Sequence, residues 1–243
     1  DIRAVEYATA QAFPGKKHEW TSDGSWLMRA GDGVTGRSNS AVPLGPAAGF
    51  NPVPLEEITE FYRRHDLPVR LLIPERIGKP VERLLADATW HTEPEILVMV
   101  LRDLAGLSAE VPGSHPSGAE FRIDAQPDDA WLEMYHFRGQ ALPAQALEYL
   151  RARIEGTMGF GRLVIDGETV AITRGTITES GDGTAWLGYS AVEVSPAHRR
   201  QGLGALLGQH MLRWGREQGA KHAYLDVLAS NTAGIRLYEK LGF

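Results

Sequence analysis

The sequence predicts an α/β (α+β) protein with mixed central sheets flanked by helices. Apolar runs of strand length alternate with helical apolar patterns in both halves of the chain, and glycine-containing turns separate many of them. The 243 residues suffice for two modest cores. Residues 108–118 are rich in Gly, Pro and Ser and predict a linker between an N-terminal domain at 1–107 and a C-terminal domain at 119–243.

Composition narrows the class of protein. Hydrophobic residues make up 43% and charged residues 23% of the chain, as is usual for a globular protein. No apolar run approaches the roughly 20 residues that cross a bilayer, and no signal peptide is visible, so we expect a cytoplasmic protein without a membrane partner. The net charge of −6 argues against nucleic acid as a partner.

Cysteine is absent, which excludes disulfides, thiolate-bound metals and an acyl-cysteine intermediate. The eight histidines are scattered, and no metal site is predicted.

The N-terminal half predicts the element order α-β-β-α-β-α-β. Its helices are expected at Ile2–Phe13, which ends at Pro14, and around Leu55–Tyr62. Its strands are expected at Ser25–Arg29 and Ser38–Val42 around a turn, and as buried runs at Val69–Ile73 and Ile96–Leu101.

The C-terminal half gives clearer signals. Helical patterns cover Asp128–Phe137, Pro143–Ile154, Leu203–Trp214 and Thr232–Leu241. Strands are expected at Arg162–Ile165 and Val170–Ile177, which an Asp-Gly turn joins, and at Trp186–Val194 and Ala223–Leu228.

The segment Val192–Gly204 predicts an anion site. An apolar strand there ends in a basic, glycine-containing turn that opens directly into a helix. Backbone N–H groups and the partial positive charge of a helix N-terminus favour a phosphate or pyrophosphate at such a place. Glycine lets the backbone approach the anion closely.

Two motifs resemble one superfamily. Residues Arg199–Gly204 resemble the Arg/Gln-x-x-Gly-x-Gly/Ala signature of the GCN5-related N-acetyltransferases (GNAT), and Asn231–Phe243 resemble their downstream Asn…Leu-Tyr-Glu-Lys-x-Gly-Phe motif. The resemblance implies a GNAT fold, in two tandem GNAT-like halves of which the first is degenerate. It also implies direct transfer of an acetyl group from acetyl-CoA, the cosubstrate, to a primary amine.

The resemblance assigns the cofactor site residue by residue. The family pattern places acetyl-CoA against Val192, Val194, Arg199, Arg200, Gln201, Gly202, Leu203, Gly204, Ala205 and Asn231. Asn231 is also suited to cap the following helix. Tyr238 matches the tyrosine that protonates the departing thiolate, although it could simply pack in the core.

The general base is left open by the sequence. Glu193 and Asp226 are candidates, and a water chain or no dedicated base is as plausible.

The acceptor is predicted from the N-terminal half. Arg29, Arg37 and Asn39 could form a wall that pairs with a carboxylate, or they could be structural. Their arrangement resembles an actinobacterial two-domain group associated with N-acetylglutamate synthesis in arginine biosynthesis, which implies glutamate as acceptor. Other small-molecule amines (a mycothiol precursor or an aminoglycoside), peptide N-termini and a non-catalytic acyl-CoA sensor are the alternatives, in a monomer or homodimer.

Two further expectations concern the C-terminal half. The spacing of Gly202, Gly204 and Gly208, with Asp226 about 20 residues on, allows a dinucleotide site in a doubly wound sheet as a rival. GNAT chains usually continue past the Gly-Phe pair into further strands, so residues that complete the sheet are expected to be missing after Phe243.

Overall fold

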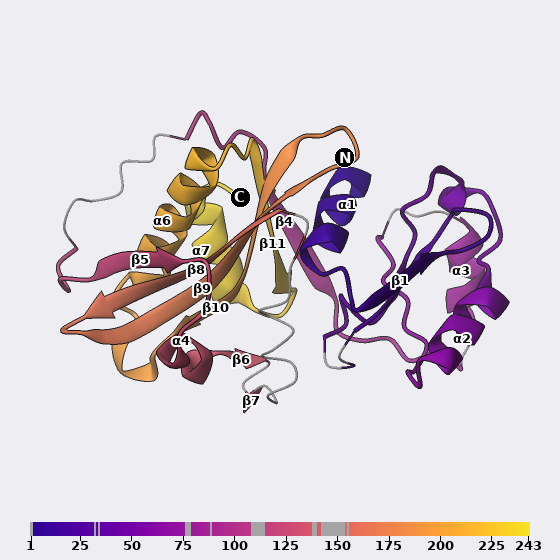
Figure 1. Cartoon of the computed structure of the whole chain (residues 1–243), viewed down its shortest axis with the longest axis horizontal. Helices are drawn as coiled ribbons and strands as arrows, with labels where there is room; N and C mark the ends of the chain where they lie inside the picture. Colours follow the sequence, from indigo (N-terminus) through magenta and orange to yellow (C-terminus); the bar gives the residue numbers. More distant parts are fainter. Residues whose placement is uncertain are drawn as a thin grey trace. The chain divides into compact units, whose positions relative to one another are not determined.

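The computed structural model describes residues 2–31, 33, 35–75, 79–87, 89–107, 115–137, 140–141, 154 and 156–243. The chain divides into two compact units, Asp1–Glu93 and Pro94–Phe243 (Figure 1). The sequence placed the linker later, at 108–118, of which 108–114 lie outside the described residues. The same holds for nearly all of the helix expected at Pro143–Ile154.

The N-terminal unit contains a three-stranded antiparallel sheet in the order β1-β2-β3. Its strands are β1 (Lys17–Trp20), β2 (Leu27–Ala30) and β3 (Ala41–Val42), and its helices are α1 (Ile2–Ala12), η1 (Pro46–Gly49), α2 (Leu55–Arg64) and α3 (Lys79–Leu85). Trp26, Met28, Ile58, Phe61 and Tyr62 form its core. This apolar cluster joins α2 to the sheet.

The strand expected at Val69–Ile73 is wrong. This segment forms only an isolated parallel bridge, between Leu71 and Ala41. Its partner strand, β3, is two residues long, so a longer ladder has nothing to pair with.

The C-terminal unit contains a six-stranded sheet in the order β4-β11-β10-β9-β8-β5. The strands are β4 (Ile96–Leu101), β5 (Glu120–Asp124), β8 (Thr157–Ile165), β9 (Glu168–Glu179), β10 (Ala185–Val194) and β11 (His222–Leu228). Strands β10 and β11 are parallel and the other neighbours are antiparallel, which confirms a mixed sheet. Asp166 (φ 50°) and Gly167 (φ 83°) form the expected tight turn between β8 and β9.

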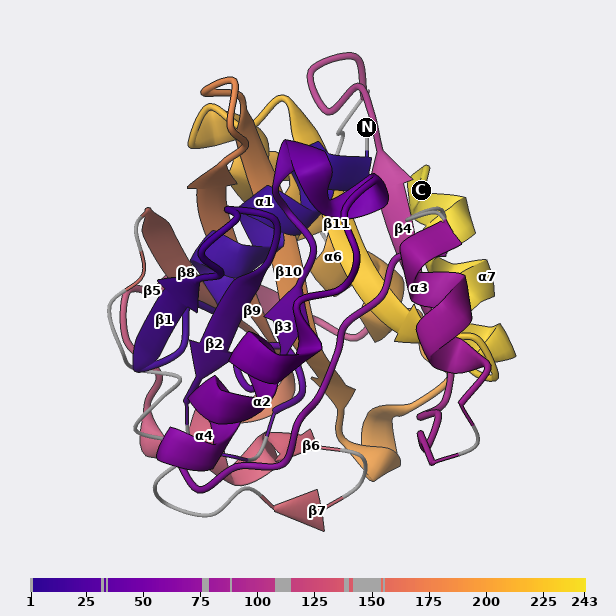
Figure 2. The same ribbon diagram turned by 90° about the vertical axis from the view of Figure 1, so that its right-hand side faces the viewer.

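Strand β4 corrects two expectations. It was assigned to the N-terminal half as a buried strand, but it pairs antiparallel with β11 in the C-terminal unit (Figure 2). As an edge strand it is only partly covered, with Ile96 46% exposed and Leu101 4% exposed. Because β4 pairs with β11 over Ala223–Leu228, the main-chain groups on the outer side of β11 have partners.

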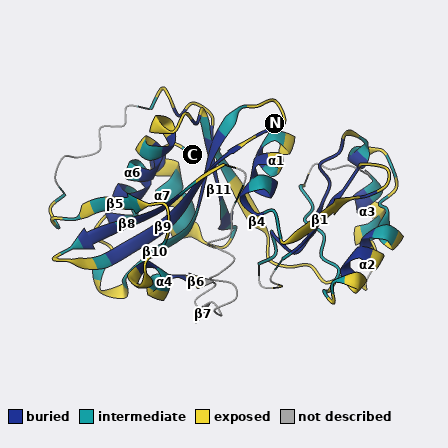
Figure 3. Cartoon of the chain, viewed as in Figure 1, coloured by how far each residue is buried: buried dark blue, intermediate teal, exposed yellow. Residues whose placement is uncertain are grey.

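Helices cover both faces of this sheet. Helices α6 (Leu203–Glu217) and α7 (Thr232–Leu241) lie on one face and α4 (Asp129–Met134) on the other (Figure 1). A short hairpin of β6 (His136–Phe137) and β7 (Gln140–Ala141) follows α4. The central strands are the most buried part of the unit (Figure 3).

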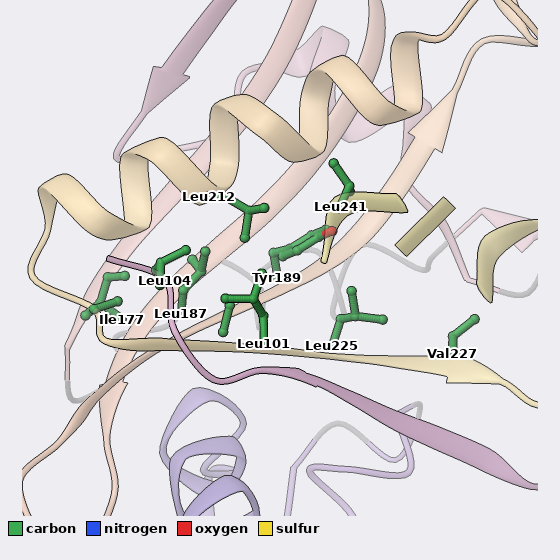
Figure 4. Close-up of a cluster of buried hydrophobic side chains, with 11 residues drawn as sticks. Leu101, Leu104, Ile177, Leu187, Tyr189, Leu212, Leu225, Val227 and Leu241 are labelled. Carbon is green, nitrogen blue, oxygen red and sulfur yellow. The ribbon is translucent and has the colours of Figure 1, made fainter. Parts of the chain in front are cut away.

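The core under α6 and α7 is built from aliphatic side chains and one tyrosine. Leu187, Tyr189, Leu212, Leu225 and Leu241 belong to it (Figure 4). Close packing depends on glycine, because a Cβ on Gly215 of α6 would lie 2.6 Å from Leu187 Cδ2. Among the helices of the described residues, none is long and apolar enough to span a membrane.

Candidate functional site

Strands β10 and β11 separate part-way along their length. They are in parallel register only at Trp186–His222, Leu187–Ala223 and Gly188–Tyr224. In the strands that the structure describes, no residue of β11 is in register with the stretch 189–194 of β10. The side of that stretch toward β11 is therefore not paired with it, and we call this place the β10–β11 opening.

A β-bulge lies beside this opening. The register between β9 and β10 shifts between Ser190 and Glu193, and Ala191 has φ 57°. The left-handed region costs an L-residue roughly 1–2 kcal/mol. Thr173 Oγ1 donates to the Ser190 carbonyl at 2.9 Å and holds the backbone there. Strained backbone of this kind gathers at functional sites.

The turn after β10 leads into an uncapped helix. After η2 (Pro196–His198), Arg200 (φ 61°) and Gly202 (φ 78°) have left-handed backbones, and Gly202 is the N-cap of α6. Because its N-cap is a glycine, no N-cap side chain accepts from the first-turn N–H groups. Its first-turn N–H groups therefore suit an external anion.

The basic side chains of the turn are accessible. Arg199 and Arg200 are exposed, and Arg199 Nε donates to the Val194 carbonyl at 3.2 Å. This bond ties the turn back to the end of β10. Gln201 and Gly202 are exposed as well.

The dinucleotide alternative is wrong. The sheet is mixed, with β10 antiparallel to β9, and not a doubly wound parallel sheet. Two of the glycines, moreover, allow α6 to pack closely against α7. A Cβ on Gly204 would lie 3.2 Å from Leu237 Cδ2, and one on Gly208 would collide with Leu241.

Asn231 and Tyr238 both belong to α7. The Asn231 side-chain oxygen accepts a hydrogen bond from the Gly234 N–H at 3.0 Å, so it caps the helix. Burial, with a smaller contribution from the charge of Glu193, raises the pKa of Tyr238 to about 12. The phenol therefore holds its proton at neutral pH and can act as an acid.

Glu193 lies on the other face of the sheet from α7. It is in register with Ile172, which packs against Trp131 of α4. Burial raises the pKa of this half-buried carboxyl, and the charges of His136 and Arg199 oppose that shift. The charge of Glu193 contributes to the raised pKa of Tyr238. The Tyr238 phenol, a proton donor, and the Glu193 carboxylate, a proton acceptor, therefore flank the β10–β11 opening from the two faces of the sheet.

Asp226, the second candidate base, is half-buried on β11 and in register with Val98 of β4. His136 was not predicted as a site residue. Its Nδ1 donates to the Met134 carbonyl at 2.8 Å, which directs Nε2 away from that bond. Nothing in the sequence signals this residue, because its neighbourhood with Glu193 depends on the β6–β7 hairpin.

The predicted acceptor residues belong to the N-terminal unit. Arg29 is 1% exposed and donates from Nε to the Ser40 carbonyl at 3.2 Å and from a terminal nitrogen to the Ser40 hydroxyl at 3.0 Å. Arg37 lies over the Phe13 ring at 4.3 Å from its centroid. Asn39 Oδ1 accepts from the N–H groups of Gly31 and Gly33 at 2.8 and 3.0 Å. These contacts are structural.

Comparisons with known proteins show the family of this chain. A family described as "Probable histone acetyltransferase Rv0428c C-terminal" matches residues 1–243. A Mycobacterium tuberculosis protein named "Probable histone acetyltransferase Rv0428c" is 35% identical over 243 residues, which are 100% of this chain and 70% of that protein. The chain belongs to this family of GNAT-type acetyltransferases.

Other relatives of this acetyltransferase extend the comparison. The Bacillus subtilis protein "Uncharacterized N-acetyltransferase YobR" is 26% identical, covering 100% of this chain and 94% of that protein. A solved GCN5-related N-acetyltransferase from Kribbella flavida has a TM-score of 0.67 at 20% identity, over 96% of this chain and 89% of that one. The structural likeness shows the GNAT fold, and the sequence relatives show an acyltransferase.

Proposed function

We propose that this chain transfers the acetyl group of acetyl-CoA directly to a primary amine. One observation carries the proposal: the β10–β11 opening leads to an uncapped, glycine-containing helix N-terminus and is flanked by Glu193 and Tyr238. An extended cofactor with a pyrophosphate at one end and a thioester at the other fits that order of features.

Each part of the cofactor has residues that suit it. The first-turn N–H groups of α6 (Leu203, Gly204 and Ala205) suit the pyrophosphate, and Arg199 and Arg200 can add charge-assisted bonds. The main chain of β10 from Val192 to Val194 suits the amides of the pantetheine arm. Asn231 uses its oxygen as a helix cap, so its Nδ2 is the atom proposed for the cofactor.

The chemistry is a direct displacement. The amine nitrogen attacks the thioester carbonyl carbon, and the Val194 N–H, by family resemblance, stabilises the oxyanion by about 2.7–4 kcal/mol. The C–S bond then breaks, and Tyr238 gives its proton to the thiolate. Glu193 is the proposed acceptor of the amine proton, which it reaches from the opposite face.

The acceptor is proposed to be a protein amine. The relative that is 35% identical is named a probable histone acetyltransferase, which favours a lysine side chain or a similar protein amine. Glutamate, with a role in arginine biosynthesis, is the second candidate acceptor. Arg29, Arg37 and Asn39 suggest it, because their side chains could bind a carboxylate. It is less favoured, because the described contacts of those residues are structural. That the N-terminal unit is a degenerate copy of the GNAT domain stays a prediction.

A CoA-release assay tests the function. Release of CoA from acetyl-CoA is followed with a thiol reagent, whose background is low because the chain has no cysteine. The panel contains histone peptides, glutamate, other amino acids, a mycothiol precursor and aminoglycosides. Turnover with lysine peptides supports the proposal, and turnover with glutamate alone would replace the acceptor.

A variant separates catalysis from binding. Tyr238→Phe should slow transfer by about 100-fold or more while the Kd for acetyl-CoA stays the same. Unchanged transfer would overturn the acid assignment. Tight acetyl-CoA binding without turnover on any amine would favour a non-catalytic sensor.

A further inference from the structure

We infer that Tyr189 is a positioning residue whose hydroxyl stabilises Tyr238 as that residue gives up its proton. The inference rests on the proposed function, in which Tyr238 is the acid. It adds a second phenol that the family motifs quoted above do not contain.

The Tyr189 hydroxyl is buried without a partner. The side chain is 4% exposed and projects from β10 into the core under α6 and α7 (Figure 4). Among the described residues, its oxygen has no hydrogen-bond partner. A buried hydroxyl in this state destabilises the fold, and phenylalanine would fill the same space without that cost. Such a group in a folded protein calls for an explanation, and a catalytic role is one.

The position of Tyr189 supplies that explanation. Its ring centroid lies 6.0 Å from that of Tyr238 at 76° and 5.8 Å from that of Phe243 at 67°. Tyr238 and Phe243 are also edge-to-face, at 6.3 Å. This aromatic triad fixes the two phenol rings beside one another.

Tyr189 also lies next to the strained backbone. Tyr189 is the first residue of β10 beyond its last pairing with β11, and it precedes Ala191 by two residues. It therefore stands where the β10–β11 opening begins, on the same face of the sheet as Tyr238. The charge of Tyr238 adds to the effect of burial in raising the pKa of Tyr189, as expected for neighbouring hydroxyls.

The proposed step balances its proton. When the C–S bond breaks, the Tyr238 O–H bond breaks, its proton joins the thiolate sulfur, and a phenolate remains. A pKa of about 12 makes that phenolate costly to form. Tyr189 keeps its own proton, and we propose that its hydroxyl donates a hydrogen bond to the phenolate oxygen as the charge forms, a bond that the resting structure does not contain. Tyr238 then regains a proton from solvent, and the cycle returns to the starting state.

The test uses Tyr189→Phe, Tyr238→Phe and the double variant in the CoA-release assay. Tyr189→Phe should lower kcat by about 10- to 100-fold, the range for a hydrogen bond to a charged group. Its Kd for acetyl-CoA should stay within about twofold and its Tm should be equal or higher, since a buried unpartnered hydroxyl is removed. The double variant should be no slower than Tyr238→Phe alone, because the first hydroxyl acts through the second.

Tyr62→Phe is the matched control. Tyr62 is buried in the N-terminal unit, but its hydroxyl donates to the Arg29 carbonyl at 2.9 Å and accepts from the Arg29 N–H at 3.2 Å. Its loss should lower Tm and leave kcat unchanged, the opposite pattern.

Three outcomes would overturn the inference. A slow Tyr238→Phe beside a fully active Tyr189→Phe would exclude Tyr189 alone and leave the proposed function intact. Additive losses in the double variant would show that Tyr189 acts independently of Tyr238. Full activity of Tyr238→Phe would instead remove the acid on which both proposals depend.

Discussion

The two units treat their buried polar groups in opposite ways. In the N-terminal unit, Arg29, Asn39 and Tyr62 are each held by at least two hydrogen bonds to nearby backbone or side-chain atoms. At the β10–β11 opening of the C-terminal unit, the Tyr189 hydroxyl has no hydrogen-bond partner among the described residues, and Ala191 has a left-handed backbone. The N-cap of α6 there is a glycine, which has no side chain to accept from the first-turn N–H groups.

This contrast distinguishes buried polar groups that stabilise the fold from polar groups that serve a ligand. Satisfied groups stabilise a fold, whereas strained or unsatisfied groups that cluster in one place mark a site whose partner is a ligand. The comparison predicts that changes in the first set alter stability and changes in the second set alter binding or turnover.

The largest effect is expected for Arg29→Ala. It removes two hydrogen bonds from a buried guanidinium and leaves the Ser40 groups unpaired, which should cost about 3 kcal/mol of unfolding free energy. Arg37→Ala, which removes one cation–π contact, should cost about 1 kcal/mol or less. Urea unfolding measures both. A raised KM for the acceptor with unchanged stability would instead place Arg29 in the acceptor site.

Arg199→Ala should weaken acetyl-CoA binding by about tenfold, because one charge-assisted contact to phosphate is lost. The affinity of the variant should also depend less on salt concentration. Arg213→Ala is the control, since Arg213 is an exposed arginine of α6 that pairs with Glu217 at 2.9 Å. Titration calorimetry distinguishes them, and equal affinities in the two variants would contradict the phosphate assignment.

Ala191→Gly should raise stability by roughly 0.5 kcal/mol, since glycine avoids the left-handed penalty but loses more chain entropy. Turnover should fall, because the bulge that shapes the opening is loosened. Asp166→Gly, at φ 50° in the β8–β9 turn, is the comparison. Asp166→Gly should change neither stability nor turnover, since Asp tolerates a left-handed backbone and the turn is distant from the opening in sequence. A marked loss of stability in Ala191→Gly would show that the bulge is not strained.

The smallest effect concerns acid stability in the N-terminal unit. Hydrogen bonds from Ser25 and Thr21 hold the pKa of Asp23 well below its usual range. Since the folded-state pKa is depressed, this stabilisation is complete above about pH 4 and is lost as the pH falls toward the folded-state pKa. Asp23→Asn should therefore flatten the decline of Tm below about pH 4. An unchanged profile would show that Asp23 contributes nothing.

Much of the C-terminal unit could be predicted because its signals are local. The Asp-Gly turn, the apolar run of β10 and the helical stripe of α6 each depend on neighbouring residues. The glycine turn was likewise visible as a motif, and the structure gives it an uncapped helix N-terminus.

The rest depends on contacts between distant segments. The run Ile96–Leu101 predicts a strand, but no sequence pattern says that it pairs with β11 about 125 residues later. Tyr189 looks like an ordinary core aromatic, and its lack of a partner appears only in three dimensions. Arg29 and Arg37 looked available for a carboxylate, and their partners Ser40 and Phe13 could not be inferred from spacing.

Hydrogen exchange with and without acetyl-CoA is the measurement that decides whether the β10–β11 opening is the cofactor site, because it reports on both units in one experiment. We expect protection of the amides at 190–194 and 203–205, with no change at Leu27–Ala30 of β2. Protection confined to the N-terminal unit, with none between 190 and 205, would contradict the assignment of the β10–β11 opening as the cofactor site.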